Sequence, residues 1–513
     1  MALPVPTETP AKPQLRWWDA VSIIVGIIVG ATIYRSPANI FGNVADQVIT
    51  IGTWSKTIPG MWAALGAWAL VGGISILGAL CYAELATTYP TSGGDFTYQT
   101  LAFGQGPGFL FAWAEMAVIR TGGSIGAMAY VFADYAERLY PLKTHLAGTA
   151  LSFLAHKPEL TYAIAAILVL TLINAFGLKP GKWMQNSLTV IKVGGLIAII
   201  VAGLLYFAWP RTADDVVTAT KPVWPFPPSF ALALVFVFYA YGGWHEAAYV
   251  AGEMKDRRRE IIKALIVGVL LVTVIYLLVN TSYLVALGRE KVKFSKVVAA
   301  DVMALPFGER GAKAISVLIM ISCLGAINGL LFTGVRLYAS FGAHERLFSW
   351  LAKTGRRISV PLGALLVQAV FSISLLVLFE TVNQWKPLVA RACDWIGIGL
   401  PDGFSKEVEG GLDGFESVVA CTSPVFWFFF LMTGYAVMVL RGRDRERERP
   451  FRVPLFPVVP ILFCLGSLFM LYRSTTWAMQ QGPAQLMIVL GFFLLGVPLY
   501  ALSGPPRRQP EIA

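Results

Sequence analysis

The residues most able to create a binding site are glycines and a proline that interrupt two strongly apolar segments. The first reads VGIIVGATIYRSPAN, with Gly26, Gly30 and Pro37, and the second reads FYAYGGWHEAAYVAGE, with Gly242 and Gly243. A break in a helix leaves backbone N–H and C=O groups unpaired. Exposed N–H groups suit an anion and exposed carbonyls suit a cation. A site that offers both suits a zwitterion, and amino acids are the commonest small zwitterions.

Charged side chains accompany these breaks. His245 and Glu246 follow the Gly-Gly pair, and Lys192 lies in the apolar segment SLTVIKVGGLIAII. Helix neighbours point about 100° apart, so at most one of His245 and Glu246 faces a pocket squarely. The alternative is a polar pair between helices. For Lys192 the residues alone favour an anchor that extends its ammonium to the membrane interface.

The sequence gives little support for a catalytic, metal-binding or phosphate-binding site. Glu115 and Arg120 are five residues apart and therefore lie on different faces of an α-helix, and we interpret Arg120 as a structural partner. The five cysteines form no CxxC pair or metal-ligand spacing. No nucleophile–base pair or phosphate loop is present either. The sequence therefore predicts no cofactor, no metal site and no enzyme activity.

Composition determines which elements can position these residues. Of the 513 residues 56% are hydrophobic and 14% are charged, and the mean hydropathy is +0.64. Soluble domains carry about 25% charged residues, so this chain must be solvated by the lipid bilayer. A soluble enzyme is excluded, and so is a nucleic-acid binder despite the net charge of +11.

Spans of about 20 apolar residues cross a bilayer. Twelve segments qualify: 17–42, 59–82, 106–133, 158–177, 187–209, 228–250, 261–287, 313–337, 361–380, 416–440, 454–474 and 484–503. An even number places both termini on one side, and the dense basic loops at 255–260 and 441–452 make that side cytoplasmic. The sequence thus predicts a multi-pass protein of the cell membrane. We interpret the alternating charges of 441–452 as a solvated anchor.

The two interrupted segments are spans 1 and 6, five spans apart. Bare glycines in one span can be packing devices, but a matched pair in corresponding spans marks the central site of a transporter built from inverted repeats. The predicted organisation is a cytoplasmic tail at 1–16, a first repeat at 17–209, a second repeat at 228–440, two further helices at 454–503 and a cytoplasmic tail at 504–513.

Five motifs resemble the L-type amino acid transporters of the amino acid–polyamine–organocation superfamily. They stand in that family's order and cover nearly the whole chain: GALCYAELATTYPTSGGDFTY (78–98), WAEMAVIR (113–120), FYAYGGW (238–244), ISCLGAINGLLFTGVRLY (321–338) and RERPFRVPLFP (447–457). The resemblance implies an all-α polytopic fold with a five-plus-five inverted repeat (LeuT-like), spans 1 and 6 broken, and two additional C-terminal helices.

The resemblance also implies roles for individual residues. The substrate carboxylate is expected on the span 1 backbone at Gly30, Ala31 and Thr32. The ammonium is expected on carbonyls at Ile28, Tyr239, Ala240 and Gly242. The side-chain pocket is expected to be lined by Gly123, Ala127, His245 and Glu246, with Tyr239 as an aromatic lid. For Lys192 the resemblance implies a coupling or gating role, because several relatives have a lysine where sodium-coupled relatives bind an ion.

Two departures from the family pattern shape our expectations. Thr32 replaces a glycine of the family's G-S-G-I-F motif, which reads GATIY here. We expect this β-branched residue to narrow the pocket and favour small amino acids. The outer loop 136–158 lacks the cysteine by which animal members join a glycoprotein, so no disulfide-linked heavy chain is expected.

The sequence therefore predicts a secondary transporter of amino acids that works by alternating access, by exchange or with protons. A carrier of organic cations or polyamines is the alternative within transport, suggested by Glu246. A membrane sensor that binds amino acids without moving them is the alternative from another class. Short tails disfavour the sensor, and an occluding central site disfavours a channel.

Overall fold

The fold is described for most of the chain. The computed structural model describes residues 17–44, 47–51, 54–90, 93–146, 152–176, 182–208, 230–246, 257–354, 360–382 and 413–504, and four single positions between 384 and 394. The predicted tail 1–16 and nearly all of the second tail lie outside these residues, as does most of 381–415, the segment between the predicted spans 361–380 and 416–440.

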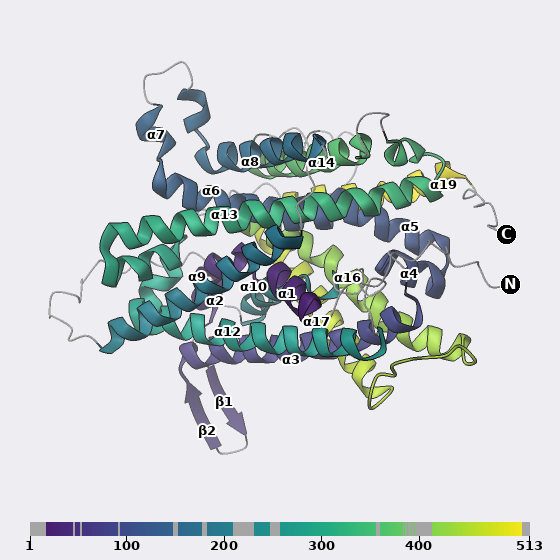
Figure 1. Ribbon diagram of the computed structural model, residues 1–513, viewed down its shortest axis with the longest axis horizontal. Helices are drawn as coiled ribbons and strands as arrows, with labels where there is room; N and C mark the ends of the chain where they lie inside the picture. Colours follow the sequence, from purple (N-terminus) through teal and green to yellow (C-terminus); the bar gives the residue numbers. More distant parts are fainter. Residues whose placement is uncertain are drawn as a thin grey trace.

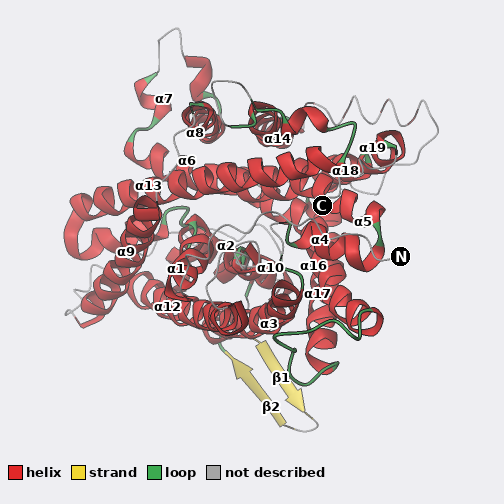
Figure 2. Cartoon of the chain, turned by 45° about the vertical axis from the view of Figure 1, so that its right-hand side comes forward, coloured by secondary structure: helices red, strands yellow, loops and turns green. Residues whose placement is uncertain are grey.

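Helices dominate the described residues (Figure 2). The longer helices are α3 (Gly60–Thr88), α5 (Gln105–Ala114), α6 (Ala127–Leu139), α8 (Pro158–Ala175), α9 (Lys182–Ala208), α12 (Arg257–Phe294), α13 (Val298–His344), α14 (Leu362–Glu380), α16 (Gly414–Arg443), α17 (Val458–Gln481) and α18 (Pro483–Leu494). Between α5 and α6 the chain forms the π-helix η2 (Glu115–Gly126), and α19 (Gly496–Ser503) follows α18. Among the described residues, ten helical stretches are long and apolar enough to cross a membrane. The chain is a multi-pass membrane protein.

The predicted spans 1 and 6 form shorter pieces. Span 1 consists of α1 (Trp17–Ile28), the 3-10 turn η1 (Ala31–Tyr34) and α2 (Ser36–Asn43). Span 6 consists of α10 (Phe230–Tyr241) and the 3-10 turn η5 (Trp244–Glu246). Both breaks therefore fall where the sequence predicts them.

The prediction of an all-helical chain needs one correction. Strands β1 (Gln47–Ile51) and β2 (Trp54–Ile58) form an antiparallel hairpin that projects from the helices (Figure 2). Their sequences, QVITI and WSKTI, are rich in β-branched residues, which favour strands. The remaining short elements are α4 (Asp95–Phe103), α7 (Leu142–His145) and the 3-10 turns η3 (Ser152–Ala155) and η7 (Ser349–Ala352).

Helices α12 and α13 extend beyond the predicted spans 261–287 and 313–337. Each contains a kink with a positive φ at a glycine, Gly288 (φ 73°) in α12 and Gly308 (φ 61°) in α13. The predicted span 261–287 thus ends beside the first kink, and the predicted span 313–337 begins shortly after the second. The segment between the kinks is helical except at 295–297.

The broken spans occupy the centre of the bundle. In Figures 1 and 2, α1, α2 and α10 lie inside a ring of longer helices. Helix α1 packs against α9 and α12, and α10 packs against α2, α3 and α16. The outer helices present apolar side chains outward, as in α8, where Val169 and Leu172 are 54% and 60% exposed. These faces suit contact with lipid.

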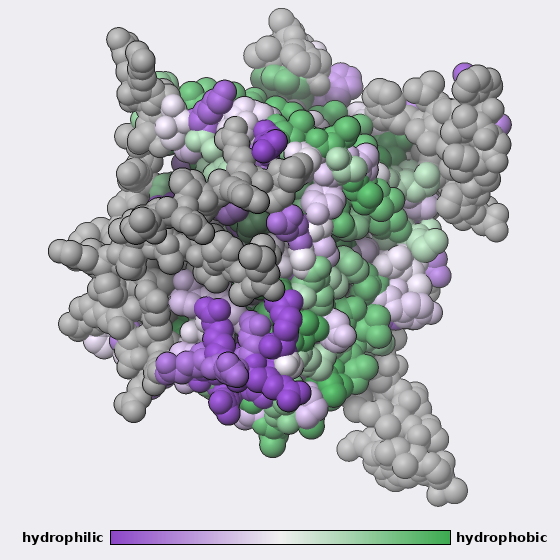
Figure 3. Space-filling model, turned by 90° about the vertical axis from the view of Figure 1, so that its right-hand side faces the viewer, coloured by the Kyte–Doolittle hydropathy of each residue, from purple (hydrophilic) through white to green (hydrophobic). Residues whose placement is uncertain are grey.

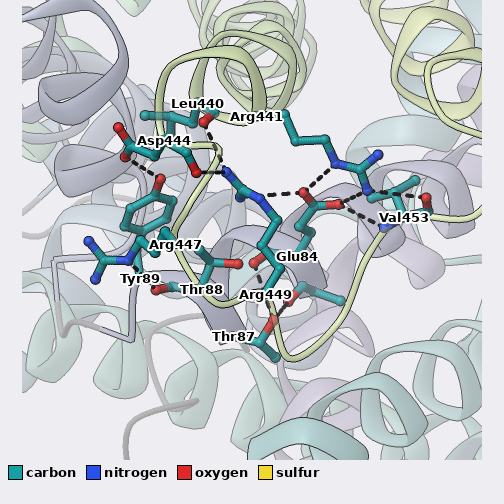
Figure 4. Close-up of polar contacts among 11 residues, drawn as sticks. Glu84, Thr87, Thr88, Tyr89, Leu440, Arg441, Asp444, Arg447, Arg449 and Val453 are labelled. Carbon is teal, nitrogen blue, oxygen red and sulfur yellow. Dashed lines mark hydrogen bonds and ion pairs between the residues drawn. The ribbon is translucent and has the colours of Figure 1, made fainter.

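The Glu84 cluster, which consists of Glu84, Arg441, Arg449 and Val453, joins α3 to α16 and the segment after it. Glu84 accepts hydrogen bonds from Arg441 Nε (2.8 Å) and Nη2 (2.5 Å) and from the Val453 N–H (2.7 Å), and Arg449 lies at 3.6 Å (Figure 4). Glu84 is 1% exposed and the Arg449 side chain 5%.

The charge run 441–452 is therefore only partly the solvated anchor that its composition predicts. Two of its arginines are held against Glu84, while other hydrophilic residues lie on the surface. Figure 3 shows a hydrophilic cluster at this end of the molecule beside hydrophobic flanks.

Candidate functional site

The break in span 1 separates two helices that end and begin without intrahelical partners. Helix α1 ends at Ile28, whose carbonyl accepts a hydrogen bond from the Gly30 N–H at 2.6 Å. Gly30 is extended (φ −84°, ψ −170°), and Pro37 stands in the first turn of α2. Proline fits there because its missing N–H would have no partner at a helix start.

The break in span 6 has a tighter geometry. Gly243 has φ 107°, a conformation that side chains disfavour, and it turns the chain from α10 into η5. A Cβ added to Gly242 would lie 3.0 Å from the Tyr239 carbonyl oxygen. Bulk at position 242 would therefore crowd the backbone of the break.

A cavity of about 310 Å³ lies beside these breaks. Its wall comes from α1, η2, α6, α9, α10, α13 and α16 and includes Gly26, Glu115, Arg120, Thr333, Thr422, Ser423 and Phe426. The volume is at the small end of the range for ligand pockets, roughly 300–1,000 Å³. It suits a small molecule rather than a large one.

The structure brings some predicted site residues to this cavity and leaves others away from it. Those that line it are Gly123, Lys192, Tyr239, Gly242 and His245. The described residues that line it do not include Ile28, Gly30, Thr32, Ala127 or Ala240. Thr32, which we expected to narrow the pocket, is buried in the turn η1. The side chains of Ala31 and Glu246 lie outside the described residues.

Two buried polar atoms at the cavity wall have no hydrogen-bond partner among the described residues. They are the Tyr239 hydroxyl and Nδ1 of His245. The His245 ring is packed among aromatic rings, with Phe430 at 5.1 Å and Tyr82 and Phe426 at 5.9 Å between centroids. Buried polar groups are usually paired, so these two atoms are available to a ligand.

Lys192 reaches the broken span from α9. Its side chain is 3% exposed in the fold, and its Nζ donates to the carbonyl oxygen of Gly26 at 3.1 Å. Gly26 is two residues before the end of α1 and itself lines the cavity. The ammonium thus touches both the broken helix and the cavity.

Glu115 and Arg120 form an ion pair that the sequence analysis did not predict. Arg120 Nε donates to Glu115 Oε2 at 3.1 Å, and its Nη1 donates to Thr333 at 3.0 Å. In the π-helix η2 the backbone bonds join residues five apart. The prediction that the two side chains lie on different faces is wrong because it assumed an α-helical period. The pairing of Arg120 itself is as predicted.

Sequence reasoning also gave no role to Thr422, Ser423 or Tyr276. The first two line the cavity from α16, and a signal existed, since CTSP is polar within an apolar span. Tyr276 lies in α12, and its hydroxyl is 2.8 Å from the Ile28 carbonyl oxygen and 3.1 Å from that of Ala240. An isolated tyrosine in an apolar span carries no such signal.

A second charged group, the Arg35 network, lies beyond the span 1 break. Arg35 Nε donates to Asp134 at 3.0 Å, and Arg35 also pairs closely with Asp413, which lies 3.5 Å from Lys296. Burial alone would raise the pKa of Asp413, but the charges of Arg35 and Lys296 outweigh it and hold that pKa below its usual range. The network joins span 1 to spans 3 and 10.

Metal ligands do not gather in the part of the chain that the structure describes: no group of three or more His, Cys, Asp or Glu side chains could hold an ion. The four described cysteines, Cys81, Cys323, Cys421 and Cys464, are free thiols.

A helical membrane protein with two interrupted spans beside a central cavity has the architecture of a membrane transporter. The chain matches the family described as "Amino acid permease" over residues 15–497, and it belongs to that family. The resemblance to amino acid transporters that the five motifs indicate is thereby confirmed. The family makes the chain a transporter of amino acids.

Similar proteins match most of the chain. The b(0,+)-type amino acid transporter 1 of Mus musculus is 27% identical, over 90% of this chain and 82% of that protein. The serine/threonine exchanger SteT of Bacillus subtilis (strain 168) is 27% identical over 95% of this chain and 96% of its own length. The cystine/glutamate transporter of Homo sapiens is 26% identical, over 96% and 85% respectively.

Proposed function

We propose that this protein carries small amino acids across the cell membrane by alternating access and exchange, binding each substrate between the breaks in spans 1 and 6. The observation that carries the proposal is the cavity at these breaks, where the Tyr239 hydroxyl and His245 Nδ1 are buried without a partner among the described residues. A substrate with several hydrogen-bonding groups would satisfy both atoms.

The proposed architecture has twelve spans with both termini in the cytoplasm. The ten long helices supply ten spans, and α1 with α2 and α10 with η5 supply the two broken ones. Residues 17–209 and 228–440 then form the two inverted repeats, and 454–503 adds two helices. The dense basic loops support the cytoplasmic side.

Lys192 is proposed to couple binding to the conformation of span 1. Its ammonium binds the Gly26 carbonyl inside the bundle, which an interfacial anchor would not do. Tyr239 is proposed as the lid, because it lies at the end of α10 and lines the cavity.

Exchange is proposed ahead of proton coupling because a relative that matches along 96% of its length is a serine/threonine exchanger. That relative's name also supports small substrates. No glycoprotein heavy chain is proposed as a partner, and the purified single chain should suffice for transport.

Counterflow in proteoliposomes tests these points together. Vesicles loaded with one unlabelled amino acid are offered a panel of labelled neutral, acidic and basic amino acids, with polyamines as competitors and with or without a pH gradient. Exchange predicts uptake that requires internal amino acid and does not require the gradient. Uptake of polyamines alone would favour the organic-cation carrier, and binding without flux would favour a sensor.

A further inference from the structure

The wall of the central cavity contains an ion pair. Glu115 and Arg120 both line the cavity, with Arg120 Nε 3.1 Å from Glu115 Oε2, and their side chains are 6% and 5% exposed. Among the described residues that line the cavity, Glu115 is the one carboxylate, and Arg120 and Lys192 are the lysine and arginine side chains. Opposite charges therefore lie side by side in the space where a substrate is proposed to bind.

The position of this pair is set by spans 3 and 8. The π-helix η2 places residues five apart on one face, which brings Arg120 to Glu115. Arg120 Nη1 donates to the Thr333 hydroxyl of α13 at 3.0 Å. Its stem packs against the same helix at Gly334, where an added Cβ would lie 2.8 Å from Arg120 Cδ. Two helices thus hold the pair in place without a ligand.

The pair determines how a charged substrate side chain interacts with the wall. A charge that enters a small cavity loses its water, which is costly unless it finds an opposite charge. An acidic side chain near Arg120 would also lie close to Glu115, and a basic side chain near Glu115 would also lie close to Arg120. Attraction by one partner is offset by repulsion from the other. A neutral side chain does not pay this cost of lost hydration.

We propose that the Glu115–Arg120 pair is the charge filter of the binding site, which admits neutral side chains and rejects acidic and basic ones. The inference rests on the proposed function and names the substrate class of the same site, neutral amino acids. Removing one partner leaves the other without its counter-charge. The cavity should then accept the side chain of opposite charge.

The test uses ligand pairs that differ in charge and hardly in size, aspartate against asparagine and ornithine against citrulline. Wild-type protein should bind each neutral member about tenfold or more tightly than its charged counterpart. In Glu115→Gln the affinity of aspartate relative to asparagine should rise about tenfold or more, because Arg120 has lost its carboxylate. In Arg120→Gln the affinity of ornithine relative to citrulline should rise for the opposite reason.

Binding is measured as thermal stabilisation of the purified protein by each ligand, which requires no flux. The ratio within a ligand pair does not depend on how much protein folds. The double variant Glu115→Gln/Arg120→Gln removes both charges and should keep the preference for the neutral members. If Arg120→Gln gives no folded protein, Glu115→Gln and the double variant decide.

Arg138→Gln is the matched control. Arg138 also forms an ion pair, 2.9 Å from Asp301, but it does not line the cavity among the described residues. Both affinity ratios should stay at their wild-type values in this variant. A change equal to that of Arg120→Gln would mean that the loss of any arginine alters the ratios, and the filter would be refuted.

Three further results would overturn the inference: wild-type protein that binds a charged member as tightly as its neutral counterpart, an unchanged ratio in Glu115→Gln, or a ratio that moves the other way. Failure of the proposed function looks different, because uptake would then survive Gly242→Leu. If Gly242→Leu abolishes uptake while Glu115→Gln behaves like Arg138→Gln, the site stands and the charge filter falls.

Discussion

The central cavity and the Glu84 cluster both hold polar groups inside the protein, yet they satisfy them differently. In the cluster, both oxygens of Glu84 accept hydrogen bonds from Arg441, and a backbone N–H adds a third. In the cavity, the Tyr239 hydroxyl and His245 Nδ1 have no partner among the described residues. A fully paired buried charge fixes helices against each other, whereas an unpaired polar atom beside a cavity is able to pair with a bound ligand.

The same contrast appears in the backbone. Around Glu84 the helices α3 and α16 are continuous and their ends are joined by side chains. Beside the cavity, the helices of spans 1 and 6 are interrupted at Gly30 and Gly242. We therefore expect changes in the cavity to remove transport and changes in the cluster to remove stability.

The largest effect is expected for Gly242→Leu. Its side chain would press on the Tyr239 carbonyl, 3.0 Å from the first added carbon, and fill the break. Uptake should be abolished while the protein still inserts and keeps its melting temperature, and Gly30→Leu should behave alike. Gly194→Leu is the control, because a Cβ there meets nothing within 4 Å. Wild-type uptake in both break variants would remove the site from this location.

Glu84→Ala should act in the opposite way. It leaves the arginines of the cluster without their partner, and breaking a buried ion pair costs about 3–5 kcal/mol. We expect a large drop in the melting temperature of the purified protein, while any folded fraction retains the wild-type KM. Glu446→Ala, at an exposed position in the same charge run, serves as the control. An unchanged melting temperature would mean that the cluster does not hold α3.

Lys192 shares features of both regions, because its ammonium is hydrogen-bonded to the Gly26 carbonyl and it also lines the cavity. Lys192→Ala tests whether it serves transport or only anchors the helix. Loss of a charged hydrogen bond predicts uptake reduced about tenfold or more and a flatter pH dependence. Lys192→Arg should not restore transport, since arginine keeps its proton. Lys263→Ala, an exposed lysine of α12, is the control. An alanine variant with normal rate and pH profile would leave Lys192 as an anchor.

The smallest effect is expected in the Arg35 network. Because the folded-state pKa of Asp413 is depressed, its charge contributes stability above about pH 4, the ordinary aspartate value, and this is lost as pH falls through the lower folded pKa. Asp413→Asn should cost about 1.5–3 kcal/mol at neutral pH and show a shallower loss of stability in acid. Asparagine also caps helices well, so the substitution isolates the charge from the cap of α16. Equal acid sensitivity of the two proteins would contradict this role.

The sequence alone was sufficient to predict the spans, the two helix breaks and the class of transporter. Hydropathy located the spans, because lipid admits only apolar helices whose backbone groups are paired internally. Gly26, Gly30 and the Gly242–Gly243 pair located both breaks, since glycine and proline interrupt a helix through local sterics alone. The family motifs then identified the class of transporter. Each of these signals lies within one segment of about 20 residues.

Only the tertiary structure decided which residues meet. Tyr276 binds the carbonyls of Ile28, 248 positions away, and of Ala240, 36 positions away, and nothing local to an apolar span indicates this. Arg120 reaches Glu115 because span 3 becomes a π-helix, a period that composition does not reveal. Lys192 lies near the predicted edge of its span, yet packing turns its ammonium inward to Gly26. Periodicity and composition describe one segment at a time, whereas a binding site depends on the distances between segments, which packing sets.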